Sequence, residues 1–348
     1  METEENIVSS GNFGGGEELV AASLKPQYLD EIVLGTEYEI LPDTKIGVAY
    51  FRRDLGRVIE DVSTDGANTY IIANPGEVDE AAVADLRRQA AAAANSGDKA
   101  REDYLNYQAD TFEGVGLYDK PKRIYNALQL TVNRRFTRNF FLAGSYTYSQ
   151  TKGNYPGLFS QETNQLDPNI TSLFDLPELL ANRYGPLGND RPHLFKVDGF
   201  YILPVRDVGL FTFGASARAQ SGVPMNTLGR HELYGADESY ILERGSAGRI
   251  GMSTRFDTHL AYALPLSRGM KLEAFIRIFN IFNQQPAIEV DERYTNEPVN
   301  PIVGGDQEDL AHLKVLGTGR TPQLWGNYKN ASRRQDPLSA QFGLRFVF

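Results

Sequence analysis

The last ten residues of the chain, Ser339 to Phe348, read SAQFGLRFVF. Alternate positions form one apolar set and one mixed set; the apolar set is Ala340, Phe342, Leu344, Phe346 and Phe348. Alternation with a period of two residues is typical of a β-strand whose two faces meet different surroundings. The pattern predicts a terminal strand whose apolar face continues to the last residue.

The same kind of strand recurs upstream in four pairs, each joined by a short turn. The predicted pairs are 28–39 with 45–54, 125–136 with 139–150, 193–203 with 209–220, and 255–264 with 269–283. Each pair is a hairpin by its length and its alternation. With the terminal segment they make about nine strands, so the predicted fold class is all-β.

Long segments rich in Gly, Pro, Asn and Asp separate these hairpins, at about 55–123, 151–192, 221–254 and 284–337. Connections in compact soluble domains have a median of about 4–6 residues. Outer-membrane barrels instead alternate short periplasmic turns with long extracellular loops. The predicted strands, about 10–12 residues each, also match the roughly 9–11 residues that a tilted strand needs to cross a bilayer. We therefore predict a transmembrane antiparallel β-barrel.

The two faces of the predicted strands support this interpretation. In 209–220, Phe211 and Phe213 alternate with Ser216 and Arg218 in the opposite phase. In 255–264, His259 shares a face with Arg255 and Asp257. A catalytic cluster is one interpretation of these three residues. Polar lumen residues that hydrogen-bond one another explain them better, so we assign no catalytic residue.

Composition narrows the class of function. The chain has 45 acidic and 35 basic residues, a formal net charge of -10, whereas nucleic-acid binders usually carry a basic stripe. There is no cysteine, and the four histidines are too scattered to form a ligand pair. No G-x-S-x-G motif supplies a serine nucleophile. We predict no enzyme activity, no cofactor and no nucleic-acid partner.

The beginning of the chain and its hydropathy add two expectations. The mean hydropathy is -0.38, which does not exclude a barrel because only alternate residues face lipid. The N-terminal METEENIVSSGNFGGG is polar and lacks the apolar core of a signal peptide. Bacterial single-chain barrels usually have an even number of strands. Nine strands and the missing signal peptide therefore suggest a truncated chain.

Two local structures are expected inside the first long loop. Residues 79–95 are rich in alanine, with acidic residues in the first turn, and predict a helix. The stretch Ser63-Thr64-Asp65-Gly66 carries a hairpin turn signal between RVIEDV and TYIIAN. It predicts a small hairpin above the membrane.

The stretch DPNITSLFDLPE has the oxygen-bearing side chains of an EF-hand calcium loop at five positions, Asp167, Asn169, Thr171, Asp175 and Glu178. Ser172 occupies the place of the required glycine, and no helices are predicted on either side. A solvated loop with Asx and proline turns is the favoured interpretation. The five residues remain a weak candidate for a calcium site.

Several stretches together resemble the C-terminal barrel of TonB-dependent outer-membrane receptors, in particular the Oar-like branch. They are LKPQYLDEIVLGTEYEI, YNALQLTVNRRFTRNFFLAGSYTYSQTKGNYPGLFS, NDRPHLFKVDGFYILP, RAQSGVPMNTLG and FNIFNQQPA, and the resemblance covers residues 24–348. The resemblance implies that residues 28–348 are the C-terminal part of a 22-stranded barrel in the outer membrane of a Gram-negative bacterium. Residues 1–27 would then be a remnant of an extracellular loop. It also implies a transporter that binds its ligand through the lumen and the extracellular loops. TonB would act through an N-terminal plug that this chain lacks.

The resemblance also assigns a role to the terminal strand. In outer-membrane proteins a terminal aromatic residue preceded by alternating apolar residues is recognised by the assembly machinery; the matching residues here are Phe342, Leu344, Phe346 and Phe348. The apolar side of the strand would then face lipid, with Gln341 and Arg345 turned to the lumen. The alternative to the receptor is a self-contained small barrel, with a tenth strand from the N-terminal residues, acting as a passive porin or an adhesin.

Overall fold

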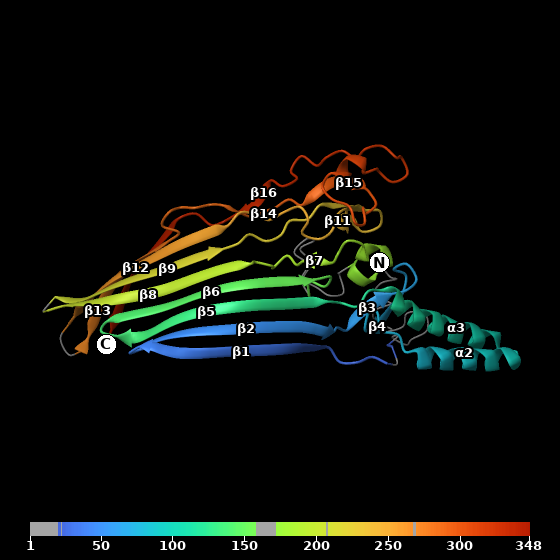
Figure 1. Ribbon diagram of the computed structural model, residues 1–348, viewed down its shortest axis with the longest axis horizontal. Helices are drawn as coiled ribbons and strands as arrows, with labels where there is room; N and C mark the ends of the chain where they lie inside the picture. The colour runs from blue at the N-terminus through green and yellow to red at the C-terminus, as the bar shows by residue number, and fades with distance from the viewer. Residues whose placement is uncertain (1–19, 22, 158–171, 207, 267–268) are drawn as a thin grey trace.

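One large antiparallel sheet dominates the computed structural model (Figure 1). The structure describes residues 20–21, 23–157, 172–206, 208–266 and 269–348. Nine long strands follow one another across this sheet in chain order, and we call them the wall. Their bounds are β1 Tyr28–Leu41, β2 Thr44–Arg57, β5 Arg123–Thr137, β6 Phe140–Gly153, β8 His193–Val205, β9 Gly209–Gln220, β12 Ser253–Pro265, β13 Lys271–Phe279 and β17 Ser339–Val347. The nine predicted strands and their four hairpins are confirmed.

Short turns join the hairpins at one end of the wall, which we call the turn end. Thr137 and Phe140 pair across a two-residue turn in which Arg138 and Asn139 both have positive φ, 49° and 65°. This is the type I′ geometry whose twist matches that of the flanking strands. The four long connections, 58–122, 154–192, 221–252 and 280–338, all leave from the opposite end, the loop end (Figure 1).

Register gives the wall one apolar face and one polar face. Leu130 pairs with Val48 on one side and with Tyr146 on the other, and these rows continue across the sheet. On the polar face Ser145 pairs with Lys196, which pairs with Arg218. Residues directly opposite each other in a ladder lie on the same face. The faces predicted for β9 and β12 are confirmed, because Phe213 pairs with Leu260 and Ser216 with Asp257.

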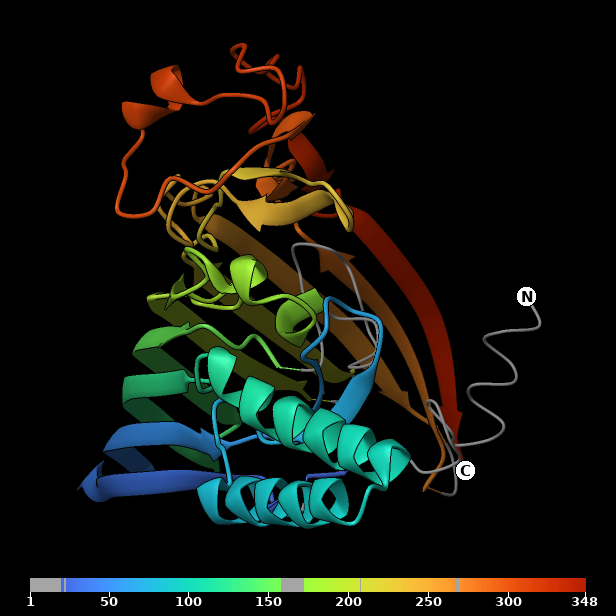
Figure 2. The ribbon, with the colours of Figure 1, turned by 90° about the vertical axis from the view of Figure 1, so that its right-hand side faces the viewer.

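The two edges of the wall do not meet within the described residues. β1 pairs only with β2, and β17 pairs only with β13, so the described sheet is open and curved (Figure 2). β7, Gly185–Pro186, adds a short pairing to β6 at the loop end. Among the same residues, no helix is long and apolar enough to span a membrane.

The long connections carry ordered structure of their own, which we call the loop cap. The first contains β3 Glu60–Ser63, β4 Tyr70–Ala73, α2 Glu80–Asn95, α3 Lys99–Gly114 and η1 Val115–Leu117. The others contain η3 Ser172–Phe174, η4 Pro177–Leu180, β10 Leu228–His231, β11 Gly235–Tyr240, β14 Ala287–Val290, β15 Arg293–Pro298, η6 Asp309–His312 and β16 Ala331–Arg334. Strands β3 and β4 form the small predicted hairpin.

The predicted helix is also present, as α2. It begins after Asp79, whose carboxylate accepts hydrogen bonds from the backbone N–H groups of Ala81 and Ala82 at 3.1 and 3.0 Å. An Asp at this position satisfies N–H groups that have no partner inside the helix. Helix α3 was not predicted; it packs antiparallel to α2, and the pair projects from the loop end (Figure 1).

Two hydrophobic cores hold the loop cap together. The first joins connections 58–122 and 154–192 through Val62, Ile71, Tyr118 and Phe174. The second joins connections 221–252 and 280–338 and consists of Ile241, Leu242, Val299, Leu310 and Leu313. Polar contacts link the two halves: the buried Arg183 pairs with Glu238, and Tyr234 donates a hydrogen bond to Asp175 at 2.6 Å. All four connections therefore form one continuous body.

Candidate functional site

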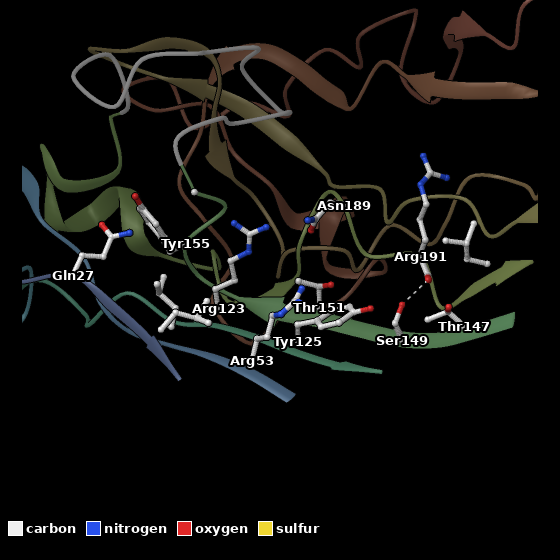
Figure 3. A pocket seen from close by; sticks show the side chains of 14 residues that line it. Gln27, Arg53, Arg123, Tyr125, Thr147, Ser149, Thr151, Tyr155, Asn189 and Arg191 are labelled. Atoms are coloured by element: carbon white, nitrogen blue, oxygen red, sulfur yellow. Dashed lines mark hydrogen bonds between the residues drawn. The ribbon is translucent and has the colours of Figure 1, made fainter. Parts of the chain in front are cut away.

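A cavity of about 620 Å³ lies at the loop end, where the polar face of the wall meets the loop cap (Figure 3). Strands of the wall contribute Leu29, Arg53, Arg123, Tyr125, Thr147, Ser149, Thr151 and Leu194. Connection 154–192 contributes Tyr155, Asn189 and Arg191 from above the sheet. The cavity is thus a recess at the mouth of the polar face, and we call it the mouth cavity.

Among the described residues that line the mouth cavity there are three arginines and no carboxylate. Nε of Arg53 donates to the Glu31 carboxylate at 2.8 Å, and its guanidinium lies 5.8 Å from the ring centre of Tyr125. Nη1 of Arg123 donates to the Pro156 carbonyl at 3.0 Å. Nη1 of Arg191 donates to the Ser221 carbonyl at 2.7 Å. Arg123 and Arg191 form no ion pair with a carboxylate in the described part of the chain.

Burial lowers the pKa of Arg191, because the protein removes part of the water that hydrates its charge. An arginine nevertheless stays protonated at any ordinary pH. The cavity therefore combines fixed positive charge with reduced hydration.

The Asp190-Arg191-Pro192-His193 motif positions Arg191. The buried Asp190 carboxylate accepts the backbone N–H of Thr151 at 2.5 Å and forms an ion pair with Arg249. Ser149 Oγ donates to the Arg191 carbonyl at 3.0 Å. These bonds fasten the start of β8 to the end of β6, so the backbone of Arg191 is fixed beside the cavity.

The Ala219-Gln220-Ser221-Gly222 motif completes this junction. The Ser221 carbonyl accepts from Arg191, and Ser221 Oγ accepts the backbone N–H of His193 at 3.1 Å. A Cβ atom on Gly222 would lie 1.8 Å from the carbonyl oxygen of Ile250, so only glycine fits there. The motif is a close-packed backbone crossing at the loop end of β9.

The Phe279-Asn280-Ile281-Phe282-Asn283 motif closes the loop end of β13. Nδ2 of Asn280 donates to the carbonyls of Gln284 and Asp336 at 2.9 and 2.8 Å. Asn283 Oδ1 accepts the backbone N–H of Leu338 at 2.9 Å. Both asparagines have positive φ, near 50°, which asparagine tolerates better than most residues. The motif ties the two ends of connection 280–338 together and sets the start of β17.

Tyr155 joins the mouth cavity to the first core of the loop cap. Its hydroxyl donates a hydrogen bond to the buried carboxylate of Glu60. Burial raises the pKa of Glu60 from 4.5 to about 7, an effect that the Tyr155 hydrogen bond partly offsets. This pair therefore carries a proton that is lost near neutral pH.

The weak calcium candidate is only partly within the described residues. Asp167, Asn169 and Thr171 lie outside them. Asp175 is buried and accepts from Tyr234, while Glu178 is exposed in η4. The described residues contain no cluster of His, Asp or Glu suited to a metal ion. The calcium site stays a prediction.

The polar cluster around His259 is a set of wall contacts. Nε of Arg255 donates to Asp257 at 2.8 Å, and the same carboxylate accepts the backbone N–H of Asn280 at 2.8 Å. His259 stands beside them and contacts the ring of Phe275. The Asp257 carboxylate therefore fixes the Arg255 side chain and the backbone at the end of β13.

The terminal strand presents its predicted assembly signal on the apolar face. Phe342, Leu344 and Phe346 are strongly exposed there, and Phe348 is 97% exposed. The rings of Phe346 and Phe348 stack with their centres 6.0 Å apart. Recognition of this strand by the assembly machinery stays a prediction.

The arginines of the mouth cavity were not singled out from the sequence. Arg53, Arg123 and Arg191 are far apart along the chain and have no motif in common. Register offered one signal: Arg53 pairs with Tyr125 on the polar face, two residues from Arg123. Arg191 joins the lining of the cavity only through the fold of the described part of connection 154–192.

Comparison with known proteins shows which family this architecture belongs to. The family model described as "Outer membrane beta barrel domain" matches residues 4–235. The chain belongs to the outer-membrane β-barrel family. It is 35% identical over 352 residues to the TonB-dependent transporter Oar of Myxococcus xanthus, covering 98% of this chain and 30% of that protein.

Two solved structures align with this chain at low similarity. The ferric-catecholate import receptor Fiu of Escherichia coli K12 aligns with 81% of this chain and 28% of its own, at 13% identity and a TM-score of 0.40. The outer-membrane transporter YddB of Escherichia coli aligns with 79% of this chain and 30% of its own, at 13% identity and a TM-score of 0.42.

These matches settle two predictions. The protein is an outer-membrane protein of a Gram-negative bacterium, as the sequence predicted. The curated relative is named as a transporter, in agreement with the prediction that the chain is not an enzyme. The chain spans about 30% of the length of the curated relative.

Proposed function

We propose that this chain is the C-terminal part of the barrel of a TonB-dependent outer-membrane transporter, and that ligands reach its lumen beneath the loop cap. The observation that carries the proposal is the 35% identity to the transporter Oar along 98% of the chain. In this arrangement the long connections are extracellular and the short turns periplasmic. TonB acts on a plug contributed by a part of the protein outside this chain.

The open wall supports a larger barrel. Along the described β1 and β17, one edge of each strand has no neighbour in the sheet. Lipid provides no hydrogen-bond partner for such backbone groups, and each unsatisfied group costs several kcal/mol. In the proposed larger barrel, further strands cover both edges in the membrane. A barrel of about 22 strands, the size expected from the resemblance, provides them.

The mouth cavity supports ligand capture by its size and its position. It lies between the polar face of the wall and Tyr155, Asn189 and Arg191 of connection 154–192 (Figure 3). A cavity of about 620 Å³ falls in the range of roughly 300–1,000 Å³ typical of small-molecule sites. A ligand that enters from outside would meet this cavity before the rest of the lumen.

The test uses the native gene product, extracted from the outer membrane in mild detergent. In planar bilayers a plugged transporter gives no steady conductance, whereas a passive porin gives stable conductance steps. Binding of the purified periplasmic domain of TonB is measured on the same preparation, with heat-denatured protein as the control. Steady conductance without TonB binding would refute the transporter and favour the small porin.

A further inference from the structure

We propose that the mouth cavity is a binding site for a small oxyanion, bearing carboxylate or phosphate groups, recognised by Arg53 and Arg123, with Arg191 adding positive charge elsewhere in the lining. Its place as an entry site for transport depends on the proposed function, but binding itself does not. The three guanidinium groups come from β2, β5 and connection 154–192 and line the same recess (Figure 3). Planar guanidinium groups match carboxylate and phosphate geometry through paired hydrogen bonds.

The lining of the mouth cavity is positively charged, whereas the whole protein is negatively charged. The chain has a net charge of -10, yet three arginines and no acidic residue are among the 14 residues that line the recess. A surface that followed the overall composition would place more carboxylates than cations there. The local excess of positive charge therefore selects for anions and against cations.

The arginines are held in place before any ligand arrives. Arg123 and Arg191 each use one N–H on a backbone carbonyl, of Pro156 and Ser221, at 3.0 and 2.7 Å. Arg53 uses Nε on Glu31. A guanidinium has five N–H donors, so each group keeps donors for a ligand while its own position is already fixed. Holding groups in advance reduces the entropy that binding costs.

Neutral polar groups complete the lining. Gln27, Tyr125, Thr147, Thr151 and Asn189 add hydroxyl and amide groups around the arginines. Such groups donate to oxyanions without adding charge. The volume admits a small molecule and excludes a folded protein.

A second cavity on the polar face shows the contrast. Its volume is about 480 Å³, and its lining includes Asp198, Asp257, His259 and Arg277. Its carboxylates are already paired, Asp198 with Arg218 at 2.8 Å and Asp257 with Arg255 at 2.8 Å. The second cavity is lined by acidic as well as basic side chains, so the oxyanion site is assigned to the mouth cavity alone.

The test is calorimetric titration of the detergent-purified native protein with citrate and, separately, with inorganic pyrophosphate. Spermidine serves as the cationic control and glycerol as the neutral control. We expect at least one anion to bind, with affinity that falls as salt rises. R53Q and R123Q should each weaken binding about ten-fold or more, since hydrogen bonds to charged groups contribute strongly.

R277Q is the matched control, because it removes an arginine of the same face from the second cavity. It should bind the anions like the unmodified protein. Heat-modifiable gel mobility, measured for every variant, identifies any that fail to fold. Comparison of citrate with pyrophosphate decides between carboxylate and phosphate recognition.

Two results would overturn the proposal: no heat from either anion at millimolar concentration, or equal weakening by R277Q and by the mouth-cavity variants in folded protein. The outcome is separable from the transporter test. Anion binding by a conducting, TonB-independent protein would keep the site and remove its transport role. TonB binding without anion binding would support the transporter and remove the anion site.

Discussion

Apolar side chains have opposite surroundings in the wall and in the loop cap. On the wall Leu34 is 65% exposed and Leu130 is 47% exposed, in rows that continue across the apolar face. In the loop cap Ile71 is 1% exposed and Leu242 is fully buried. The wall therefore leaves its apolar groups for lipid to cover, while the loop cap covers its own, as a water-soluble domain does.

The difference separates two sources of stability within one chain. The wall depends on backbone pairing and on the membrane, since no apolar core of the described residues lies against its polar face. The loop cap depends on packing between connections distant in sequence. The two regions should then respond to different perturbations, and the following predictions test that separation from the largest effect to the smallest.

Phe174→Ala should destabilise the loop cap by about 3–5 kcal/mol. Phe174 is buried against Tyr118 and Tyr155, with ring centres 5.9 and 6.3 Å away. Hydrogen exchange should accelerate in connections 58–122 and 154–192 but not in the wall strands. Leu117→Ala, at an exposed position of the same region, should change little. Equal loss of protection in wall and cap would show that they unfold as one unit.

Raising the pH should weaken the loop cap through Glu60. Its folded pKa, about 7, lies above the ordinary 4.5 because burial disfavours the charged form. The stabilisation is therefore complete below about pH 4.5 and is lost as the pH rises through 7, by about 3 kcal/mol. Cap unfolding followed from pH 4.5 to 8 should show this slope, and Glu60→Gln should flatten it. An unchanged slope in Glu60→Gln would assign the effect to another group.

Leu130→Arg should destabilise the wall by about 2–4 kcal/mol in phospholipid vesicles, the cost of a cation at the lipid-facing middle of a strand. Thr131→Arg places the same side chain one residue further on, on the polar face. That control should have a much smaller effect on the free energy of unfolding. Similar losses in both variants would contradict the assignment of the faces.

Asp79→Ala should loosen the start of α2 by about 1 kcal/mol, because two backbone N–H groups lose their acceptor. Exchange of the Ala81 and Ala82 amides measures the change. Asp85→Ala removes an exposed carboxylate from within the helix and should leave those amides protected. Faster amide exchange throughout the wall would show that the α2–α3 pair also stabilises the wall strands.

The wall was predictable from the sequence because its signals are local. Each strand carries its own alternation, and each partner follows after a short turn, as with β5 and β6. Helix α3 was missed because its buried positions, Leu105, Ala109 and Thr111, are few and only weakly apolar. The capping residue Asp98, which accepts from the Arg101 N–H, was a signal that could have found it.

The loop cap and the mouth cavity were not predictable in the same way. Tyr118 and Phe174 share a core although one connection ends and a whole hairpin intervenes before the other begins. No periodicity within either segment specifies that contact. The motifs that carried the family resemblance proved to be backbone junctions, at Asp190, Gly222 and Asn280, that fix where the connections leave the wall.

The order of strands in the wall has a consequence for how the protein forms. Every neighbour in the wall is also the next wall strand along the chain, from β1 to β17. Growth of the sheet therefore needs no threading: each hairpin closes across a few residues, where loop-closure entropy is small. The terminal strand pairs with β13 over nine residues. Pairing can start there and proceed strand by strand toward the N-terminus. Each completed hairpin would then deliver one more long connection for the cap to fold.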